Sequence, residues 1–359
     1  MRILYISNVD WNWIKQRPQF LAEALAKENK VEVIYQYKYG QRHQFQSNKV
    51  EKNINLNVLP MHVVPRLDRY DHLRKINDIL RKRFLSKRIS EFKPDWIYVT
   101  HPVQVDMIPK KYHGKIIYDC MDDHILLEHQ PKLIEKKEKK LINRATVITV
   151  TSNRLKQILK SRYNLTNISN IHLVRNGFNG PILKVKSSNY KKKQLHKIAY
   201  FGSISTWFDF NLLEASLKKF DNLEYFLIGP VDDKVKVPTN ERIHFLGTVE
   251  HSKLYDTIKD MDALIMPFIV NDVIKAVDPV KIYEYINFDK NIITVKYNEL
   301  KHFSPYVFFY EDKTSFMKAI ENVISLNDKT SYSPESRMKF LADNSWNERA
   351  QEIEDILLK

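Results

Sequence analysis

The stretch DPVKIYEYINFDK, Asp278–Lys290, contains the pattern that most constrains the fold. It follows an apolar run, ALIMPF, that predicts a buried strand. Asp278 and Pro279 indicate a helix start, with Asp278 as the capping residue and Pro279 at the first helical position. A strand that leads into a helix in this way is the unit from which helix-covered parallel sheets are built.

Lys281 and Glu284 lie three residues apart and therefore share one face of this helix. In an α/β domain that face looks out from the sheet edge where ligands collect. A cation beside free helical N–H groups suits a diphosphate, and a carboxylate one turn later suits the two hydroxyls of a ribose. The alternative is an ordinary surface pair that stabilises the helix by about 0.2–0.5 kcal/mol.

Outward from this stretch, short apolar runs alternate with helical patterns along almost the whole chain, which is the rhythm of doubly wound parallel sheets. An Asn-, Gly-, Ser- and Lys-rich segment interrupts the rhythm and predicts a linker. We therefore expect α/β architecture with two Rossmann-like domains. The predicted boundaries are 1–178 for the N-terminal domain, 179–194 for the linker, 195–340 for the C-terminal domain and 341–359 for a final helix.

Several classes of protein are excluded by what the sequence lacks. The first strand leads into SNVDWNWIKQRP without a glycine, so the G-x-G-x-x-G of nicotinamide-dependent dehydrogenases is missing. The phosphate-binding motif of P-loop NTPases is missing as well.

A single cysteine, Cys120, excludes a disulfide framework, and the twelve histidines show no metal-ligand spacing, so we expect no metal site. Asp260 and Asp262 form a D-x-D pattern, but between a helix and a buried strand a structural role is the better interpretation.

The charge of +15 is distributed unevenly. Residues 1–180 contain 33 Lys and Arg against 17 Asp and Glu, whereas residues 181–359 contain 25 against 26. A basic half beside a neutral half predicts that one domain faces an anionic partner, which could be a phosphorylated substrate, an acidic membrane surface or nucleic acid. No apolar run is long enough to span a bilayer, and the N-terminus reads as a strand, so we expect a cytoplasmic protein.

The chain resembles bacterial GT-B glycosyltransferases of the surface-polysaccharide kind, especially those of teichuronic acid and exopolysaccharide assembly. The segments that match, in order, are WNWIKQRPQFLAEALA, YDCMDD, VRNGFN, YFGSISTWFDFNLL, HFLGTV, LIMPF, DPVKIYEY and DNSWNERA. The resemblance implies two Rossmann-like domains that face a cleft, with the C-terminal helix returning to the N-terminal domain. It also implies a nucleotide sugar, with UDP favoured, on the C-terminal domain and a glycan or lipid-linked acceptor on the N-terminal one.

By this resemblance Glu284 binds the ribose hydroxyls and Lys281 the donor phosphates. Gly202 and Ser203 allow the backbone to approach the phosphates closely, and Gly229 and Pro230 end the next strand beside the nucleotide base. Many members place an Arg and a Lys after the first of these glycines, where this chain has Ser203, Ser205 and Trp207. Many retaining members also have a second Glu at the position of Ala276.

An inverting transferase needs a general base for the acceptor hydroxyl, and the Asp122–Asp123 pair follows the apolar strand KIIYDC at a carboxyl end. We favour Asp122 as the base, since Asp123 could instead cap the next helix. His101 ends another strand at the same edge and is a second polar candidate.

Asp10, Trp11, Trp13 and Arg17 stand where a glycine loop is usual. Aromatic faces and planar polar groups bind sugars, and Arg17 could meet an acceptor phosphate, so we expect acceptor-binding residues here. The alternative is that Trp11 and Trp13 fasten the loop to the domain.

The segment HLRKINDILRKRFLSKRISEF predicts a basic amphipathic helix. Its apolar side is expected to hold Leu73, Ile76, Leu80, Phe84 and Ile89, with Arg74, Lys75, Arg81, Lys82, Arg83, Lys87 and Arg88 around the rest. A second segment, KLIEKKEKKLINR, has the same character. Either could lie on an anionic membrane, or be an ordinary core-facing helix with a solvated rim.

The sequence thus predicts a cytoplasmic transferase, peripheral at the inner face of the cell membrane. It would move a hexose or hexuronic acid from a nucleoside diphosphate sugar to a lipid-linked surface glycan, without a cofactor. Two alternatives are a nucleic-acid-binding protein and a GT-B relic that binds nucleotide sugars without catalysis. The chain has no zinc-finger or RRM signature, so we expect no nucleic-acid partner.

Overall fold

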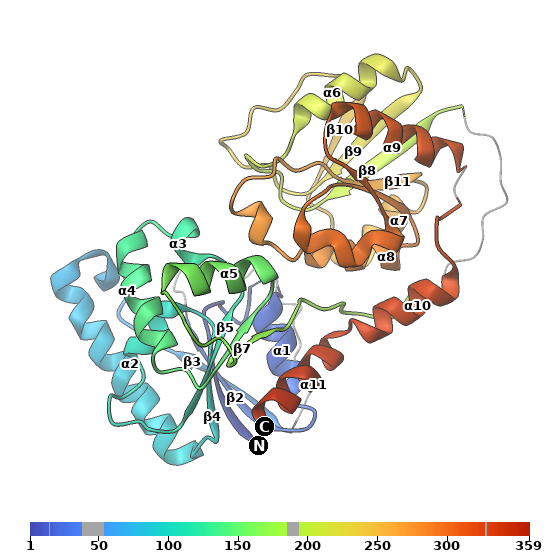
Figure 1. Ribbon diagram of the computed structural model, residues 1–359. Helices are drawn as coiled ribbons and strands as arrows, with labels where there is room; N and C mark the ends of the chain where they lie inside the picture. Colours follow the sequence, from blue (N-terminus) through green and yellow to red (C-terminus); the bar gives the residue numbers. More distant parts are fainter. Residues whose placement is uncertain (14, 38–53, 185–193, 327–328) are drawn as a thin grey trace. The chain divides into compact units, whose positions relative to one another are not determined.

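A computed structural model describes residues 1–13, 15–37, 54–184, 194–326 and 329–359 of the chain. The described residues form two compact units, which are Met1–Asn176 together with Trp346–Lys359, and Gly177–Ser345. Each unit is built on its own parallel sheet with helices against it (Figure 1). The predicted α/β class and the two Rossmann-like sheets are therefore confirmed.

The first unit contains a seven-stranded sheet in the order β3-β2-β1-β4-β5-β6-β7, with all neighbours parallel. Its strands are β1 (Arg2–Ser7), β2 (Lys30–Gln36), β3 (Leu56–Met61), β4 (Trp96–Val99), β5 (Lys115–Cys120), β6 (Val147–Val150) and β7 (Ile171–Leu173). Its helices are α1 (Arg17–Leu25), α2 (Asp71–Phe92), α3 (His124–Leu127), α4 (Pro131–Ile142), α5 (Asn153–Arg162) and α11 (Trp346–Leu357), with the 3-10 turns η1 (Leu67–Arg69) and η2 (Pro102–Asp106).

Helices on both faces explain why the central strands read as continuous apolar runs. In β1 every residue after Arg2 is buried, and β4 is buried throughout. In Figure 1, α1 and α11 lie on one side of the sheet, with α2 and α4 on the other. Helix α11 packs directly on α1, where Phe20 and Trp346 stack with ring centroids 5.3 Å apart. The last helix of the chain thus completes the first unit.

The second unit contains a six-stranded parallel sheet in the order β10-β9-β8-β11-β12-β13. Its strands are β8 (His196–Phe201), β9 (Leu223–Ile228), β10 (Ile243–Gly247), β11 (Ala263–Met266), β12 (Asn291–Val295) and β13 (Val307–Tyr310). Its helices are α6 (Phe210–Lys219), α7 (His251–Ile258), α8 (Val280–Asn287), α9 (Lys313–Ser325) and α10 (Pro334–Asp343), with the 3-10 segments η3 (Ile274–Ala276) and η4 (Asn298–Tyr306). Within the unit, α6 and α9 cover one side of the sheet and α7 and α8 the other (Figure 1).

The boundaries between the units differ from the predicted ones. The second unit begins at Gly177, because the Phe178 N–H donates to the Asn344 carbonyl (2.7 Å) and the Leu183 N–H to the Asn287 side chain (2.9 Å). Helix α10 also belongs to this unit, since the buried Arg337 donates to the Asn287 carbonyl (2.8 Å). The helix that returns to the first unit therefore starts at Trp346 rather than at 341. Residues 185–193 of the predicted linker lie outside the described residues.

The start of α8 also differs from the sequence prediction. Pro279, with φ of −82°, is the capping residue, and the first helical residue is Val280. Asp278 precedes this position, and its buried carboxylate lies 3.7 Å from His302 Nε2.

Candidate active site

The two sheets share one topological feature. In the first unit the chain reverses its direction of winding between β1 and β4, and in the second between β8 and β11. At such a switch point the loops after two adjacent strands diverge and leave a crevice at the carboxyl edge, which is where α/β domains bind ligands. The predicted site residues of each unit follow these strands or the adjacent strands β5 and β9.

In the second unit Gly202 and Gly229 follow β8 and β9, and both positions require glycine. Their φ angles are +135° and +138°, in a region that side-chain-bearing residues avoid. A Cβ atom at Gly229 would overlap the carbonyl oxygen of Gly202, so the two turns touch. Two backbone bonds join them, from Gly202 N–H to the Ile228 carbonyl (2.8 Å) and from Ile204 N–H to the Pro230 carbonyl (2.9 Å).

Lys281, in the first turn of α8, lies against the Gly202 turn. A Cβ atom at Gly202 would overlap Cε and Nζ of this lysine. The Nζ atom is 5.7 Å from the centroid of the Tyr200 ring, a cation–π distance. Burial lowers the pKa of Lys281, and the Glu284 carboxylate partly opposes this. Within the described part of the chain the Lys281 ammonium makes no hydrogen bond, which leaves its donors available to an anion.

Glu284 lies one turn further along α8 and is half-buried. The two flanking tyrosines, Tyr283 and Tyr285, are fully buried. The Tyr285 hydroxyl donates to the Ile265 carbonyl (3.3 Å) and lies 3.3 Å from the Phe201 N–H, so it ties α8 to the ends of β8 and β11. Lys281 and Glu284 are thereby held at the switch point.

The other residues predicted for the donor site have different environments. Ser203 is exposed and its carbonyl accepts a bond from the Tyr200 hydroxyl (2.8 Å), and Pro230 is exposed as well. Ser205 is buried, and its hydroxyl donates to Asp232 (2.9 Å). This bond indicates that Ser205 supports the loop after β9. Trp207 is half-buried, and its carbonyl accepts from the Ile269 N–H (2.7 Å).

In the first unit Thr100 joins the two strands at the switch point. Its hydroxyl donates to the Ile6 carbonyl (2.9 Å) and accepts from the Asn8 N–H (3.0 Å). Of the predicted acceptor-binding residues in the following loop, Asp10 and Trp11 are buried, and Asp10 accepts from the Asn12 N–H (3.0 Å). Trp13, in contrast, is 40% exposed.

Arg17, also predicted to meet the acceptor, is buried and already paired. Its guanidinium binds both carboxylate oxygens of Asp119 at 2.9 Å and donates to the Arg175 carbonyl (3.0 Å) and the Asn176 side chain (3.2 Å). These bonds neutralise the buried guanidinium charge. They also join α1 to β5 and to the segment that contains Arg175 and Asn176. We therefore assign Arg17 a structural role and do not retain it as an acceptor residue.

Asp123 is likewise paired with an arginine. It occupies the capping position of α3 but makes no capping bond. Instead Arg162 donates to both of its carboxylate oxygens, at 2.9 and 2.6 Å. The buried Glu138 lies 3.6 Å from Arg162 and accepts from the hydroxyls of Tyr118 and Tyr163, both at 2.7 Å. This network holds the loop after β5 onto α4 and α5.

Asp122 lies between these two ion pairs and has no partner of its own. Within the described residues its half-buried carboxylate makes no hydrogen bond or ion pair. Burial raises the pKa of Asp122 to about 7, with Arg17 opposing the rise and Asp119 and Asp123 adding to it. Asp122 can therefore gain or release a proton near neutral pH.

His101 lies at the same edge, and both of its ring nitrogens have partners within the unit. Its Nδ1 accepts from the Val103 N–H (3.3 Å), which leaves Nε2, 3.3 Å from Glu128, as the protonated nitrogen. Burial lowers the pKa of His101, although Glu128 acts in the opposite sense. His124 lies against it with ring centroids 4.4 Å apart, and burial and the neighbouring imidazole lower the pKa of His124 to about 3. Both rings are therefore neutral at physiological pH.

Sequence reasoning missed the groups that support these residues. Asp119 could have been noticed, because a carboxylate inside the buried run KIIYDC must have a partner. The sequence gives no comparable signal for Arg162, which lies 39 residues from Asp123, or for Tyr200, which resembles any buried strand tyrosine.

The contact between the two glycine turns predicts unequal effects of alanine. We expect Gly229→Ala to displace the Gly202 turn, in addition to backbone strain of about 1–3 kcal/mol. Gly247→Ala is the matched control, because Gly247 also has a positive φ (+68°) but a Cβ there meets nothing within 4 Å. Its cost should be limited to about 1–2 kcal/mol. Urea unfolding of both variants is the measurement, and equal losses would contradict the close contact.

The raised pKa of Asp122 predicts a stability effect that is independent of activity. Between the unfolded pKa of about 3.9 and the folded value of about 7, the folded state binds a proton that the unfolded state releases. The unfolding free energy therefore falls as pH rises through this window. Asp122→Asn removes the effect, so its Tm relative to wild type should increase from pH 4 to pH 8. A pH-independent difference in Tm would argue against a raised pKa.

Comparison with known proteins identifies the fold. No protein-family model matches the sequence, and no curated protein matches it. Solved structures do match along the full chain. One is the lipopolysaccharide outer core galactosyltransferase WaaB, with 11% identity, a TM-score of 0.70, and coverage of 100% of this chain and 99% of WaaB.

Two further structures match over similar lengths. Anabaena HepE, solved in complex with UDP-glucose, has 14% identity, a TM-score of 0.69 and 99% coverage of both chains. A variant of S. aureus TarM, solved with fondaparinux, α-GlcNAc-glycerol and UDP, has 9% identity, a TM-score of 0.67 and 100% coverage of both chains. The chain therefore has the GT-B fold.

Proposed function

We propose that this protein is a glycosyltransferase that takes a sugar, a hexose or hexuronic acid, from a UDP-sugar. The observation on which the proposal depends is the Lys281 ammonium. It lies against the Gly202 turn, has no hydrogen bond within the described residues, and is partly desolvated at the N-terminal turn of α8. A desolvated cation beside free helical N–H groups and a glycine turn suits a diphosphate.

The rest of the donor site follows from the same geometry. Glu284, one turn after Lys281, would accept the ribose hydroxyls, and Gly229 and Pro230 would border the base. Two structural neighbours, HepE and TarM, were solved with UDP or a UDP-sugar, which supports a uridine nucleotide here as well.

In the proposed reaction Asp122 removes the proton of the acceptor hydroxyl while the nucleotide leaves. A general base works best when its pKa is near the operating pH, and the pKa of Asp122 is about 7. Asp119 and Asp123 are less suitable, because Arg17 and Arg162 occupy both oxygens of each carboxylate. The neutral His101 is the next candidate, although both of its nitrogens have partners in the unit.

For the acceptor we propose a lipid-linked surface glycan, with Trp13 contributing an aromatic face. The structural neighbour WaaB is a lipopolysaccharide outer core galactosyltransferase, which supports this class. The reaction would then take place at a membrane surface. Nucleic acid is the weaker alternative, because the chain has no zinc-finger or RRM signature.

The donor site predicts stabilisation by UDP. At 100 times the dissociation constant, UDP should add about 2.7 kcal/mol to the unfolding free energy. Lys281→Met and Glu284→Ala should each weaken UDP binding by roughly 10- to 100-fold, the value of one or two lost charge-assisted bonds. Lys275→Met is the control, since Lys275 is exposed and paired with Asp272 at 3.1 Å. Thermal shift with UDP, GDP and TDP is the measurement. A folded protein that none of these nucleotides stabilises would refute the proposed function.

The assignment of Asp122 predicts a pH profile. The kcat/KM for the acceptor should rise with pH to a plateau above about 7, as the carboxyl group loses its proton. Asp122→Asn should lower kcat by roughly 10²-fold or more and leave the Kd for UDP unchanged. Asp123→Asn removes a like charge that raises the pKa of Asp122, so the rising limb should move to lower pH. Full activity of Asp122→Asn would transfer the role of the base to another residue.

A further inference from the structure

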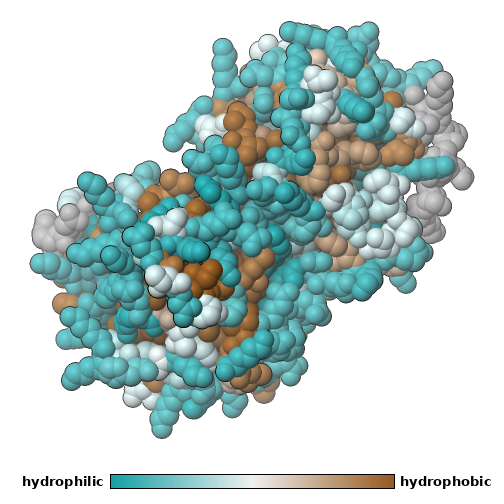
Figure 2. All heavy atoms as spheres, viewed as in Figure 1, coloured by the Kyte–Doolittle hydropathy of each residue, from teal (hydrophilic) through white to brown (hydrophobic). Residues whose placement is uncertain are grey.

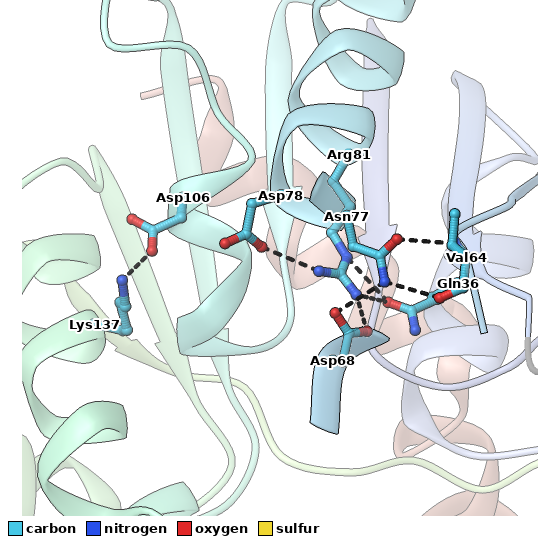
Figure 3. A network of polar contacts seen from close by, with 8 residues as sticks. All are labelled: Gln36, Val64, Asp68, Asn77, Asp78, Arg81, Asp106 and Lys137. Atoms are coloured by element: carbon cyan, nitrogen blue, oxygen red, sulfur yellow. Dashed lines mark hydrogen bonds and ion pairs between the residues drawn. The ribbon is translucent and has the colours of Figure 1, made fainter. Parts of the chain in front are cut away.

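Helix α2 is attached to the first unit through polar side chains. Asn77 is fully buried, accepts from the Val64 N–H (2.9 Å), and donates to the Val64 carbonyl (3.0 Å) and to Asp68 (3.1 Å). Figure 3 shows these bonds between α2 and the segment before it. A buried amide with so many partners fixes which face of the helix points inward.

Two arginines extend this inward face. Arg81 donates to Gln36 (3.1 Å) and Asp78 (3.1 Å) and is ion-paired with Asp68, which leaves its side chain only 13% exposed (Figure 3). Arg88 donates to both carboxylate oxygens of Glu32, at 2.7 and 2.6 Å. These two residues, expected from the sequence to lie on the basic outer surface, therefore bind the unit itself.

The outward face of α2 carries an apolar stripe, although the inward face also contains the fully buried Leu85. Ile76, Ile79 and Leu80 are 46%, 50% and 36% exposed. Their spacing of three and four residues places them in one stripe. The sequence had placed Ile76 and Leu80 on one apolar side together with Leu73, Phe84 and Ile89. In the structure Ile76 and Leu80 are exposed, whereas the other three are half-buried. Most of the surface visible in Figure 2 is hydrophilic, so an apolar stripe on a helix is an exception to the general pattern.

Cations surround this apolar stripe. Arg83 and Lys87, seven and eleven residues after Ile76, continue the line of the stripe along the helix. Lys75 and Lys82 lie beside the stripe. All four of these cations are exposed. A second copy of the chain would bring the same positive charge against this surface and repel it. An anionic lipid surface complements both the charges and the apolar residues.

We infer that the outward face of α2 docks the protein on an anionic lipid bilayer, with Ile76, Ile79 and Leu80 entering the boundary between headgroups and acyl chains. The inference deepens the proposed function, and rests on it, by naming the surface at which a lipid-linked acceptor would be met. The helix lies along the interface, and none of the described helices combines the length and apolarity that a transmembrane span requires. Insertion of apolar side chains distinguishes this mode from attraction by net charge alone.

Helix α4 provides a matched comparison. It is as basic as α2, but its apolar residues Ile134 and Leu141 are buried, so it is a core-facing helix with a solvated rim. If net charge alone attracted the protein to membranes, the lysines of α4 would matter as much as those of α2.

The test is co-sedimentation of the full chain with phosphatidylcholine vesicles that contain or lack phosphatidylglycerol. We expect binding only to the anionic vesicles, and weaker binding at high salt. Three triple variants separate the contributions: Ile76→Ser/Ile79→Ser/Leu80→Ser, Lys75→Glu/Lys82→Glu/Arg83→Glu, and the α4 control Lys132→Glu/Lys136→Glu/Lys139→Glu. The serine variant should bind roughly tenfold or more weakly, and the α2 charge variant roughly 100-fold or more weakly. The α4 control should bind much more tightly than the α2 charge variant.

Three results would overturn the inference. The first is unchanged binding of the serine variant, and the second is an equal loss in the α2 and α4 charge variants. The third is a wild-type dimer that the serine variant converts to a monomer with no change in vesicle binding, which would make the face an interface between copies. UDP thermal shift on the same variants separates this inference from the proposed function. Vesicle binding without UDP binding would refute the transferase assignment and leave the docking surface in place.

Discussion

In both sheets every strand runs parallel, so the chain leaves each strand at the same edge and continues into a helix or loop there. The winding reverses between β1 and β4 and between β8 and β11, and α/β domains bind ligands at such switch points. Gly202, Gly229 and the start of α8 meet at this edge of the second unit, and the loops after β1 and β4 meet at this edge of the first. The chemistry of each unit depends on this arrangement of parallel strands.

Within the first unit the distribution of arginines decides which carboxylate can react. Asp119 and Asp123 are held in bidentate ion pairs by Arg17 and Arg162, while Asp122 between them has no such partner in the described part of the chain. Bidentate pairing favours the ionised form of a carboxylate, whereas burial without a partner disfavours it. The same principle applies in the second unit, where the unbonded Lys281 ammonium contrasts with the paired lysines of the surface.

Helix α2 is oriented by polar contacts together with the fully buried Leu85. Asn77, Arg81 and Arg88 each find partners on the sheet side, and this places Ile76, Ile79 and Leu80 in solvent. Burying exposed apolar side chains against a second surface removes them from water and is favourable. The outward orientation of these three residues is therefore the basis of the docking surface that we infer.

The sequence by itself determined the elements and the positions that need special backbone or spacing. Apolar runs predicted the strands, the glycines marked the two turns, and the spacing of Lys281 and Glu284 placed them on one helical face.

Only the tertiary structure decided which charges are paired. Arg17 meets Asp119 across 102 residues and Arg81 meets Gln36 across 45, and such partners have no signature in local sequence. Local pattern fixes the helix or strand, but the burial and neighbours that set a residue's charge state come from contacts between distant segments. The roles of Arg17, Asp122 and Arg81 were therefore fixed only by the folded chain.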